Sequence, residues 1–326
     1  MFAYDHKAYE TSNVKQIGWW WRWWWCWWYD DDDDDDDDDD NHDDGDFDGD
    51  GFNEILSTDN ISSVFLSKNT ESGYEQVWTY PFKIDAGDVL QVLAVNVDND
   101  AESEIVIVSS NAISIIYDLH SMAETVLYSP SEIKYAQLAD TNEDGVLELA
   151  YLTSGSRFDN RENELKVVSI DTPQNVLFAQ ALGSAKEFVF GNVDNDINIE
   201  LITNNGFVYD AFTWQNQWTS GNEFSDSIMV VADLNNDGVD EIVGADYWGD
   251  ISVYSALSES KIASIESYNN CSVIAANVDS GAASELIVGE CGRDEITAFS
   301  LLDNTFESVW SISSQASGLV SLVTGD

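Results

Sequence analysis

A nine-residue pattern recurs six times along the chain, and it restricts the possible folds more than any other feature. Its clearest copy is segment 233–241, with the sequence DLNNDGVDE. Oxygen-bearing side chains stand at positions 1, 3 and 5, glycine at position 6, a free carbonyl at position 7 and glutamate at position 9. This is the ligand order of a calcium-binding loop, because calcium takes about six to eight oxygen ligands and needs a tight turn to gather them.

The six copies, numbered here as sites one to six, are spaced almost evenly. They begin at Asp46, Asn96, Asp140, Asn192, Asp233 and Asn277, so that successive starts lie 50, 44, 52, 41 and 44 residues apart. Apolar, β-branched segments flank the loops, as at 228–231 and 242–243 around site five. We therefore expect each loop to join two strands, and a strand-containing repeat of this period is typical of a propeller or solenoid.

Four short strands are expected between successive loops. They are 53–57, 62–67, 74–80 and 89–97 in the first interval, and 104–109, 112–117, 123–129 and 132–139 in the second. Four strands joined by tight polar turns make one antiparallel blade, with each loop placed between the last strand of one interval and the first strand of the next. The sequence thus predicts an all-β fold, a β-propeller of four-stranded antiparallel blades.

The ends of the repeat region predict the number of blades. Poly-aspartate precedes site one, whereas 318–326 has the pattern of a strand that stops at position 1 of an absent seventh loop. If this strand pairs beside 54–57, six blades close by pairing of the N- and C-terminal strands, and closure removes two exposed sheet edges. The alternative is a truncated seven-bladed propeller.

The loops resemble a known repeat. The segments DFDGDGFNEIL, DTNEDGVLEL and DLNNDGVDEI look like the FG-GAP or VCBS repeats of integrin-alpha-type β-propellers, and the resemblance covers residues 46–326. It implies calcium bound in loops on one face of the propeller and ligand recognition on the other. The FG and GAP tags of that family are mostly lost here.

Sites one, three and five are complete, with glycine at position 6. Their candidate calcium ligands are Asp46, Asp48, Asp50, the Phe52 carbonyl and Glu54; Asp140, Asn142, Asp144, the Val146 carbonyl and Glu148; and Asp233, Asn235, Asp237, the Val239 carbonyl and Glu241. Three calcium ions are expected at these sites. Such ions would be mainly structural, since they neutralise clustered carboxylates and fix the adjoining strands. The alternative is that each loop is only a polar turn.

The other three sites depart from the pattern. Sites two and four keep the oxygens Asn96, Asp98, Asp100 and Glu104, and Asn192, Asp194, Asp196 and Glu200. They place Ala101 and Ile197 at position 6, where a β-branched residue would be strained in a left-handed conformation. We expect weaker calcium binding or a relaxed loop there, so two further ions are possible. Site six has Gly281 at position 5 and is expected to lack metal.

Residues 1–45 form a separate, low-complexity segment. Eight tryptophans lie within 19–28, and eleven aspartates follow at 30–40. We expect no stable structure, because low complexity supplies no specific packing. An interfacial anchor beside an acidic spacer is the alternative. The rest of the chain, 46–326, is the predicted calcium-binding β-propeller.

Charge and motifs limit the possible functions. The net charge is −50, and residues 46–326 alone carry 47 acidic and 9 basic groups, which argues against nucleic acid or an anionic membrane as a partner. No stretch is long enough for a membrane-spanning helix, and no signal peptide is visible. The three histidines are His6, His42 and His120, and no nucleophile or catalytic zinc motif is present. We therefore expect no enzyme activity, with a polysaccharide-lyase-like enzyme as a remote alternative.

Binding is the expected role. The segments 157–161, 212–218 and 247–248 are long or aromatic enough to contact a protein or glycan, although packing between blades explains each of them equally well. We predict an extracellular or cell-surface, calcium-stabilised propeller that acts as an adhesion or recognition module. A purely structural domain of a larger surface protein is the alternative. Cys271 and Cys291 are expected to face each other in a hairpin, as a disulfide or as two buried thiols.

Overall fold

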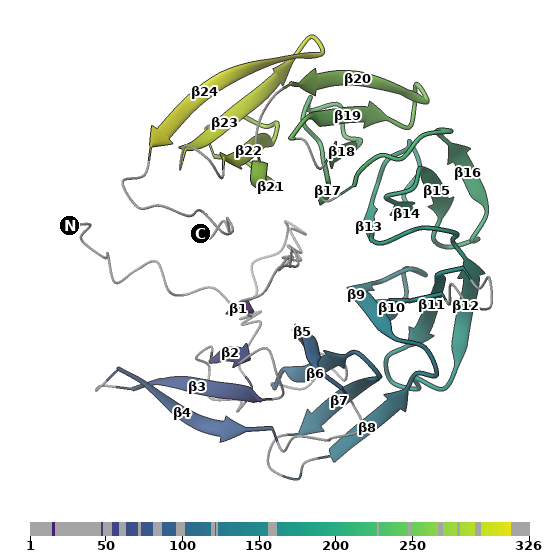
Figure 1. Cartoon of the computed structure of the whole chain (residues 1–326), viewed down its shortest axis with the longest axis vertical. Coiled ribbons are helices and arrows are strands. Elements are labelled where there is room, and N and C mark those ends of the chain that lie inside the picture. The colour runs from purple at the N-terminus through teal and green to yellow at the C-terminus, as the bar shows by residue number, and fades with distance from the viewer. Residues whose placement is uncertain are drawn as a thin grey trace. The chain divides into compact units, whose positions relative to one another are not determined.

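The structure is a computed structural model of the chain. It describes residues 15–16, 47, 54–58, 63–70, 73–80, 87–95, 102–118, 121, 123–155, 162–226, 228–246, 249–266, 270–278, 281–290 and 295–313. These residues form six four-stranded sheets (Figure 1). Neighbouring strands follow one another in the chain, and the sheets are antiparallel except that β1 runs parallel to β2. The fold is an all-β propeller of six blades, as the sequence predicts.

Contacts within the chain divide it into two compact units. The first includes residues up to Leu138 and Val146–Gln180, and the second includes Ala139–Gly145 and Ala181–Thr324. The first three sheets consist of β1 (Lys15–Gln16), β2 (Ile55–Thr58), β3 (Val64–Thr70) and β4 (Gly73–Thr79); β5 (Val89–Val95), β6 (Glu104–Ser109), β7 (Ala112–Asp118) and β8 (Ala123–Tyr128); and β9 (Ile133–Ala139), β10 (Glu148–Thr153), β11 (Glu164–Ser169) and β12 (Val176–Ala181).

The three remaining sheets belong to the second unit. They consist of β13 (Phe188–Gly191), β14 (Glu200–Thr203), β15 (Phe207–Asp210) and β16 (Asn216–Thr219); β17 (Ile228–Ala232), β18 (Glu241–Ala245), β19 (Ile251–Ser255) and β20 (Ser260–Ile265); and β21 (Asn270–Ala276), β22 (Glu285–Glu290), β23 (Glu295–Leu302) and β24 (Thr305–Ser313). All eight strands predicted for the first two intervals are present, with ends that differ by at most two residues except at β3, which extends three residues further.

The position of the loops differs from the prediction. The sequence reading placed each loop between two blades, with 89–97 in the same blade as 53–57. In the structure β5 pairs with β6 across site two, so the loop lies inside a sheet, between its first and second strands. The prediction was wrong because a tight nine-residue turn brings the strands on its two sides into direct antiparallel pairing.

The second strand is the most deeply buried strand in five of the sheets. β6, β10, β14, β18 and β22 are buried at every position, which agrees with their almost continuous apolar sequences. The fourth strands are more exposed, and β12 is exposed at five of its six positions. In the first unit, one apolar cluster joins strands β5 to β11 and includes Ile113, Leu149 and Val168. In these five sheets each loop therefore leads directly into the fully buried strand.

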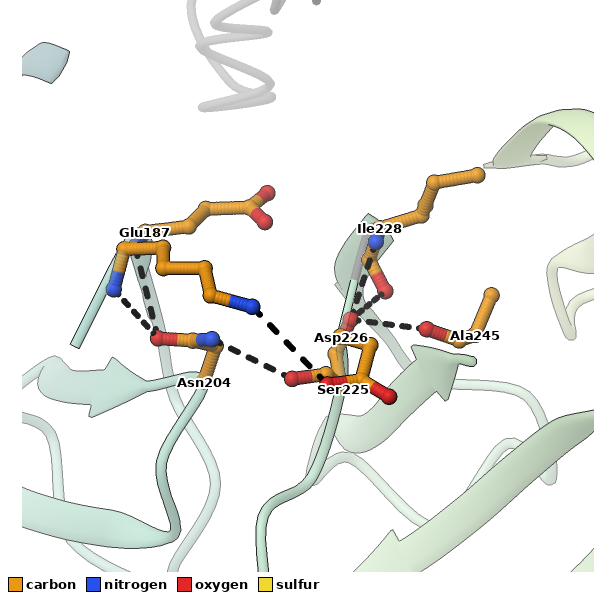
Figure 2. Close-up of polar contacts among 7 residues, drawn as sticks. Glu187, Asn204, Ser225, Asp226, Ile228 and Ala245 are labelled. Carbon is orange, nitrogen blue, oxygen red and sulfur yellow. Dashed lines mark hydrogen bonds and ion pairs between the residues drawn. The ribbon is translucent and has the colours of Figure 1, made fainter. Parts of the chain in front are cut away.

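Polar side chains join two sheets of the second unit (Figure 2). Oδ1 of Asn204 accepts hydrogen bonds from the backbone N–H groups of Lys186 at 2.8 Å and Glu187 at 3.3 Å, and its Nδ2 donates to the Ser225 carbonyl at 3.1 Å. The Ser225 hydroxyl lies 3.0 Å from the Ala245 carbonyl. The segment between β16 and β17 is thus fixed to both sheets.

The two ends of the repeat region are only partly described. Lys15–Gln16 lies within the segment predicted to lack structure, and it pairs in parallel with Ser57 and Thr58 of β2. The C-terminal segment 318–326, predicted to pair beside 54–57, lies outside the described residues. Closure by pairing of the two ends therefore remains a prediction.

The predicted cysteine pair lies at an irregular hairpin. The β21–β22 ladder pairs Ser272 with Gly289 and Asn270 with Glu290, so Cys271 occupies a bulge opposite Glu290. The simple register that would place Cys271 opposite Cys291 is not the observed one. Cys291 lies outside the described residues, and the disulfide remains a prediction.

Candidate metal centres

One contact recurs in the loops and fixes the glutamate at position 9. One carboxylate oxygen of this side chain accepts the backbone N–H of position 2: Phe47 to Glu54 at 2.9 Å, Val193 to Glu200 at 2.8 Å, Leu234 to Glu241 at 3.0 Å and Val278 to Glu285 at 3.0 Å. The four glutamates are at most 2% exposed. The bond to Oε2 fixes the orientation of each carboxylate relative to its loop.

The loops at sites three and five are organised around their first aspartate. The Asp140 carboxylate accepts the N–H groups of Asn142, Asp144 and Gly145 at 2.9 to 3.3 Å. Asp233 accepts those of Asp237 at 3.1 Å and Gly238 at 2.9 Å. These bonds curl the backbone around the position-1 carboxylate, as a calcium loop requires.

Left-handed backbone at two positions makes this curl possible. Position 6 is Gly145 at site three, with φ 80°, and Gly238 at site five, with φ 85°. Position 4 is also left-handed, with φ 58° at Glu143 and 59° at Asn236. The sequence reading identified the glycine but not position 4, where polar residues tolerate this conformation better than β-branched ones.

Site four reaches a similar arrangement by another backbone route. Neither Asn195 nor Ile197 is among the residues with positive φ. Nδ2 of Asn192 donates to the Asp196 carbonyl at 3.1 Å, and the N–H of Asp196 donates to Asp194 at 2.7 Å. Ile197 therefore does not adopt the strained left-handed conformation, as in the relaxed-loop alternative expected for this site, and the strength of calcium binding there remains a prediction.

The carboxylates of site four converge. Oxygen atoms of Asp194, Asp196 and Glu200 lie within 4.8 Å of one another. Glu200 is fully buried, and its Oε1 has no hydrogen-bond partner; the same holds for the buried Oδ1 of Asn192. Among the described residues, this is the one group of at least three His, Cys, Asp or Glu side chains arranged to hold a metal ion.

The electrostatics of site four favour a cation. Burial raises the pKa of Glu200 to about 8, and the negative charges of Asp194, Asp196 and Asp210 act in the same direction, against the hydrogen bond from Val193. Asp210 lies opposite Glu200 in the β14–β15 ladder. A divalent cation would remove this repulsion, and the all-oxygen set of donors suits a hard ion such as calcium.

At site five an amide contacts the position-9 glutamate. Nδ2 of Asn235 donates to Oε1 of Glu241 at 2.6 Å. Burial raises the pKa of Glu241 to about 7, with Asp237 and Asp233 adding to the effect. Half a turn of the Asn235 amide would present its oxygen in place of Nδ2, so these groups can also serve as ligands.

Site six is closed by internal donors. The Ser300 hydroxyl donates to Oε1 of Glu285 at 3.3 Å, and Nδ2 of Asn277 donates to the Gly281 carbonyl at 2.7 Å. Position 5 is Gly281 and supplies no carboxylate. The Asn277 contact repeats that of Asn192 at site four, so what distinguishes site six is the missing carboxylate at position 5 and the hydroxyl on Glu285.

Sites one and two are described only in part. Glu54 and Glu104 are buried at the start of their strands. The remaining candidate ligands lie outside the described residues: Asp46, Asp48, Asp50, Phe52, Asn96, Asp98 and Asp100. The sequence reading missed Lys68, whose Nζ lies 3.8 Å from Oε1 of Glu54. The ladder places Ser67 opposite Ile55 and so brings Lys68 beside Glu54. The strand register is the signal that could have identified it.

The predicted ligand-contacting segments are divided between surface and core. Trp218 is 7% exposed and packs against Phe224 with ring centroids 5.1 Å apart, so it is a packing residue. Phe212 is 55% exposed. The segments 157–161 and 247–248 lie outside the described residues, as do His6, His42 and His120. No helix in the described part of the chain has the length and apolar character needed to cross a membrane.

Comparison with known proteins identifies the fold but no family. No family model matches the chain, and no curated protein matches it. A chain in the crystal structure of a mitotic checkpoint complex is similar, with a TM-score of 0.56, 12% identity, and 82% of this chain and 78% of that chain covered. A chain in the crystal structure of BBS1N in complex with ARL6DN, soaked with lead, has a TM-score of 0.57, 13% identity and coverages of 82% and 79%. Both neighbours are β-propellers.

Proposed function

We propose that this protein is a calcium-binding β-propeller of the FG-GAP or VCBS type. It acts as an extracellular recognition module that binds a protein or glycan ligand. One observation carries the metal assignment: at site four, two buried oxygens without hydrogen-bond partners, Glu200 Oε1 and Asn192 Oδ1, accompany the carboxylates of Asp194 and Asp196. A buried acceptor without a donor is costly, and a bound cation removes that cost.

The net charge supports the same assignment. With 62 acidic and 12 basic residues, the chain repels itself unless cations bind. The donors in the described loops are oxygens, which calcium prefers over the nitrogen and sulfur ligands of transition metals. Because calcium binds the folded loops and not the unfolded chain, its binding free energy adds to the free energy of unfolding.

Support for recognition comes from exposed apolar side chains beside site four. Ile197 is 80% exposed and Phe212 is 55% exposed. The N–H of Ala211 donates to the Ile199 carbonyl at 3.0 Å, and Nε2 of Gln217 donates to Asp194 at 2.9 Å. The β15–β16 turn therefore lies against the metal loop, so that a partner bound there would contact Phe212 and sense whether calcium is present.

The metal assignment is tested by thermal unfolding of the full chain in millimolar calcium, in magnesium and in EDTA, together with direct counting of bound calcium. We expect calcium to raise the melting temperature more than magnesium does. Glu200→Gln should remove one bound ion, whereas Glu307→Gln, a charge change on the exposed strand β24, should remove none. Equal melting temperatures in calcium and EDTA would reject the assignment.

The recognition role is tested separately. Glycan arrays and a panel of extracellular proteins are probed with the wild-type chain and with Phe212→Ala, in calcium and in EDTA. Specific, calcium-dependent binding that Phe212→Ala weakens supports the proposal. A fully folded, calcium-loaded protein that binds nothing on either panel would favour a structural role.

A further inference from the structure

Two neighbouring metal loops of the second unit are bonded to each other through one side chain. Oδ2 of Asp240, at position 8 of site five, accepts the backbone N–H of Asn192, at position 1 of site four, at 3.0 Å. In return, the N–H of Asp240 donates to the Asn192 carbonyl at 2.7 Å. This reciprocal pair fixes the backbone of Asn192, the residue that supplies the first oxygen of site four.

The two loops approach each other closely at Gly191. A Cβ on Gly191, immediately before Asn192, would lie 3.0 Å from Oδ2 of Asp240 and 2.6 Å from the Val231 side chain. The absence of a side chain at Gly191 therefore allows the two loops to approach closely. Asp240 is joined directly to Glu241, the position-9 ligand of site five, so any ordering of Glu241 also orders Asp240.

The next pair of loops has only half of this contact. The N–H of Ser284, at position 8 of site six, donates to the Asp233 carbonyl at 3.0 Å. This repeats the backbone bond from Asp240 to Asn192. Among the described residues, the additional carboxylate bond is found between sites four and five. The fold thus supplies the backbone contact, and Asp240 adds the side-chain contact.

We propose that Asp240 is a positioning residue that couples calcium binding at sites four and five, so that an ion in one loop raises the affinity of the other. This inference rests on the proposed function, since it requires both sites to bind calcium. The physical reason is shared ordering: calcium at site five fixes Glu241 and Asp240, and Asp240 then holds Asn192 in its ligating position. The second ion therefore meets a loop that is already ordered.

The test is calcium titration of the full chain by calorimetry, with each ion assigned by the substitution that removes it. Asp196→Asn removes the ion of site four, and Glu241→Gln removes that of site five. We expect the affinity of site four to fall by about fivefold or more when Glu241→Gln empties site five, which is the range of ordinary coupling. In an Asp240→Ala background, Glu241→Gln should change the affinity of site four by less than about twofold, as for independent sites.

Three controls separate coupling from charge and from simple destabilisation. Asp240→Asn keeps an oxygen that can accept the Asn192 N–H, so it should preserve the coupling while removing the charge. Ser284→Ala changes the same position of the next loop and should leave the coupling intact. Glu307→Gln removes one distant negative charge and should do the same.

Each outcome is decisive. If wild-type protein binds no calcium at these sites, the proposed function fails and this inference fails with it. If both ions bind but Glu241→Gln leaves the affinity of site four unchanged, only the coupling is overturned. Coupling that survives in Asp240→Ala would overturn the role of Asp240. Coupling that is lost equally in Asp240→Asn would show a charge effect and would also overturn positioning through the hydrogen bond.

Discussion

Nδ2 of Asn204 donates a hydrogen bond to the backbone carbonyl of Ser225 at 3.1 Å, and this bond joins the end of β14 to the segment that leads into β17 (Figure 2). The same side chain accepts the N–H groups of Lys186 and Glu187. Asn204 is 2% exposed. One buried amide thus bonds three backbone groups on two different connections, those before β13 and before β17.

Asn204→Ala should therefore be strongly destabilising. It removes the side-chain partner of one buried donor, the Glu187 N–H, and of one buried acceptor, the Ser225 carbonyl, and each such loss costs about 1 to 3 kcal/mol. We expect the free energy of unfolding to fall by about 3 kcal/mol, measured by urea denaturation in calcium. Glu307→Gln on the exposed strand β24 serves as the control, because exposed substitutions change stability by only about 0.5 kcal/mol. A loss of less than about 1 kcal/mol would contradict the role given to Asn204.

An alanine substitution at position 6 should lower stability at site five but not at site four. Gly238 has φ 85° and open space around a new Cβ, so Gly238→Ala adds backbone strain but no clash. We expect it to cost about 1 to 2 kcal/mol. Ile197 is exposed and has no positive φ, so Ile197→Ala should change stability by less than about 0.5 kcal/mol. Urea denaturation of both variants under the same conditions provides the measurement. Equal losses of stability would show that position 6 has the same backbone conformation in both loops.

These two loops show how far the sequence could predict the site. Periodicity predicted the propeller and the strands of the first two intervals, because apolar runs and turn residues are local signals, but it placed the loops between blades instead of inside a sheet. It could not decide between a strained and a relaxed backbone at Ile197, because a pattern does not contain the hydrogen bonds of site four, from Asn192 Nδ2 to the Asp196 carbonyl and from the Asp196 N–H to Asp194. It also missed Lys68 and Asp240, since their contacts depend on the register of strands and on the approach of one loop to another.

A buried carboxyl group should make stability depend on pH. Glu187 is 9% exposed, and burial raises its pKa to about 8 from 4.5, against a hydrogen bond from Met229. Figure 2 shows its side chain extending away from Asn204. The folded state therefore holds this proton up to about pH 8, whereas the unfolded chain releases it near pH 4.5. Between these values the folded state binds more protons, so its contribution to stability falls as pH rises.

Glu187→Gln should remove this contribution. The glutamine stays neutral and keeps an oxygen for the Met229 N–H, so the variant should be more stable than wild type at pH 8 and differ little from it at pH 4. Both proteins are unfolded with urea across this range in saturating calcium, which holds the metal-loop carboxylates ionised. A difference between the two proteins that does not grow with pH would show that Glu187 is ionised in the folded protein.

Lys68 should weaken calcium binding at site one while stabilising the metal-free protein. Its Nζ lies 3.8 Å from Oε1 of the fully buried Glu54 carboxylate, so the ammonium partly neutralises a charge that calcium would otherwise neutralise. Lys68→Met keeps most of the side-chain length and removes the charge. We expect it to lower the melting temperature in EDTA, because a buried carboxylate loses its counter-charge. In calcium the loss of melting temperature should be smaller. The calcium affinity of site one, identified as the site that Glu54→Gln empties, should rise several-fold.

The matched control is Lys134→Met. Lys134 pairs with Glu132, whose side chain is half exposed and belongs to no metal loop. Exposed ion pairs contribute at most about 1 kcal/mol, so this substitution should change neither the melting temperature in EDTA nor any calcium affinity appreciably. If Lys68→Met and Lys134→Met behave alike in both conditions, the lysine beside Glu54 has no part in the metal site. If Lys68→Met alone lowers the stability of the metal-free protein and raises the calcium affinity, the Lys68 ammonium competes with calcium for Glu54.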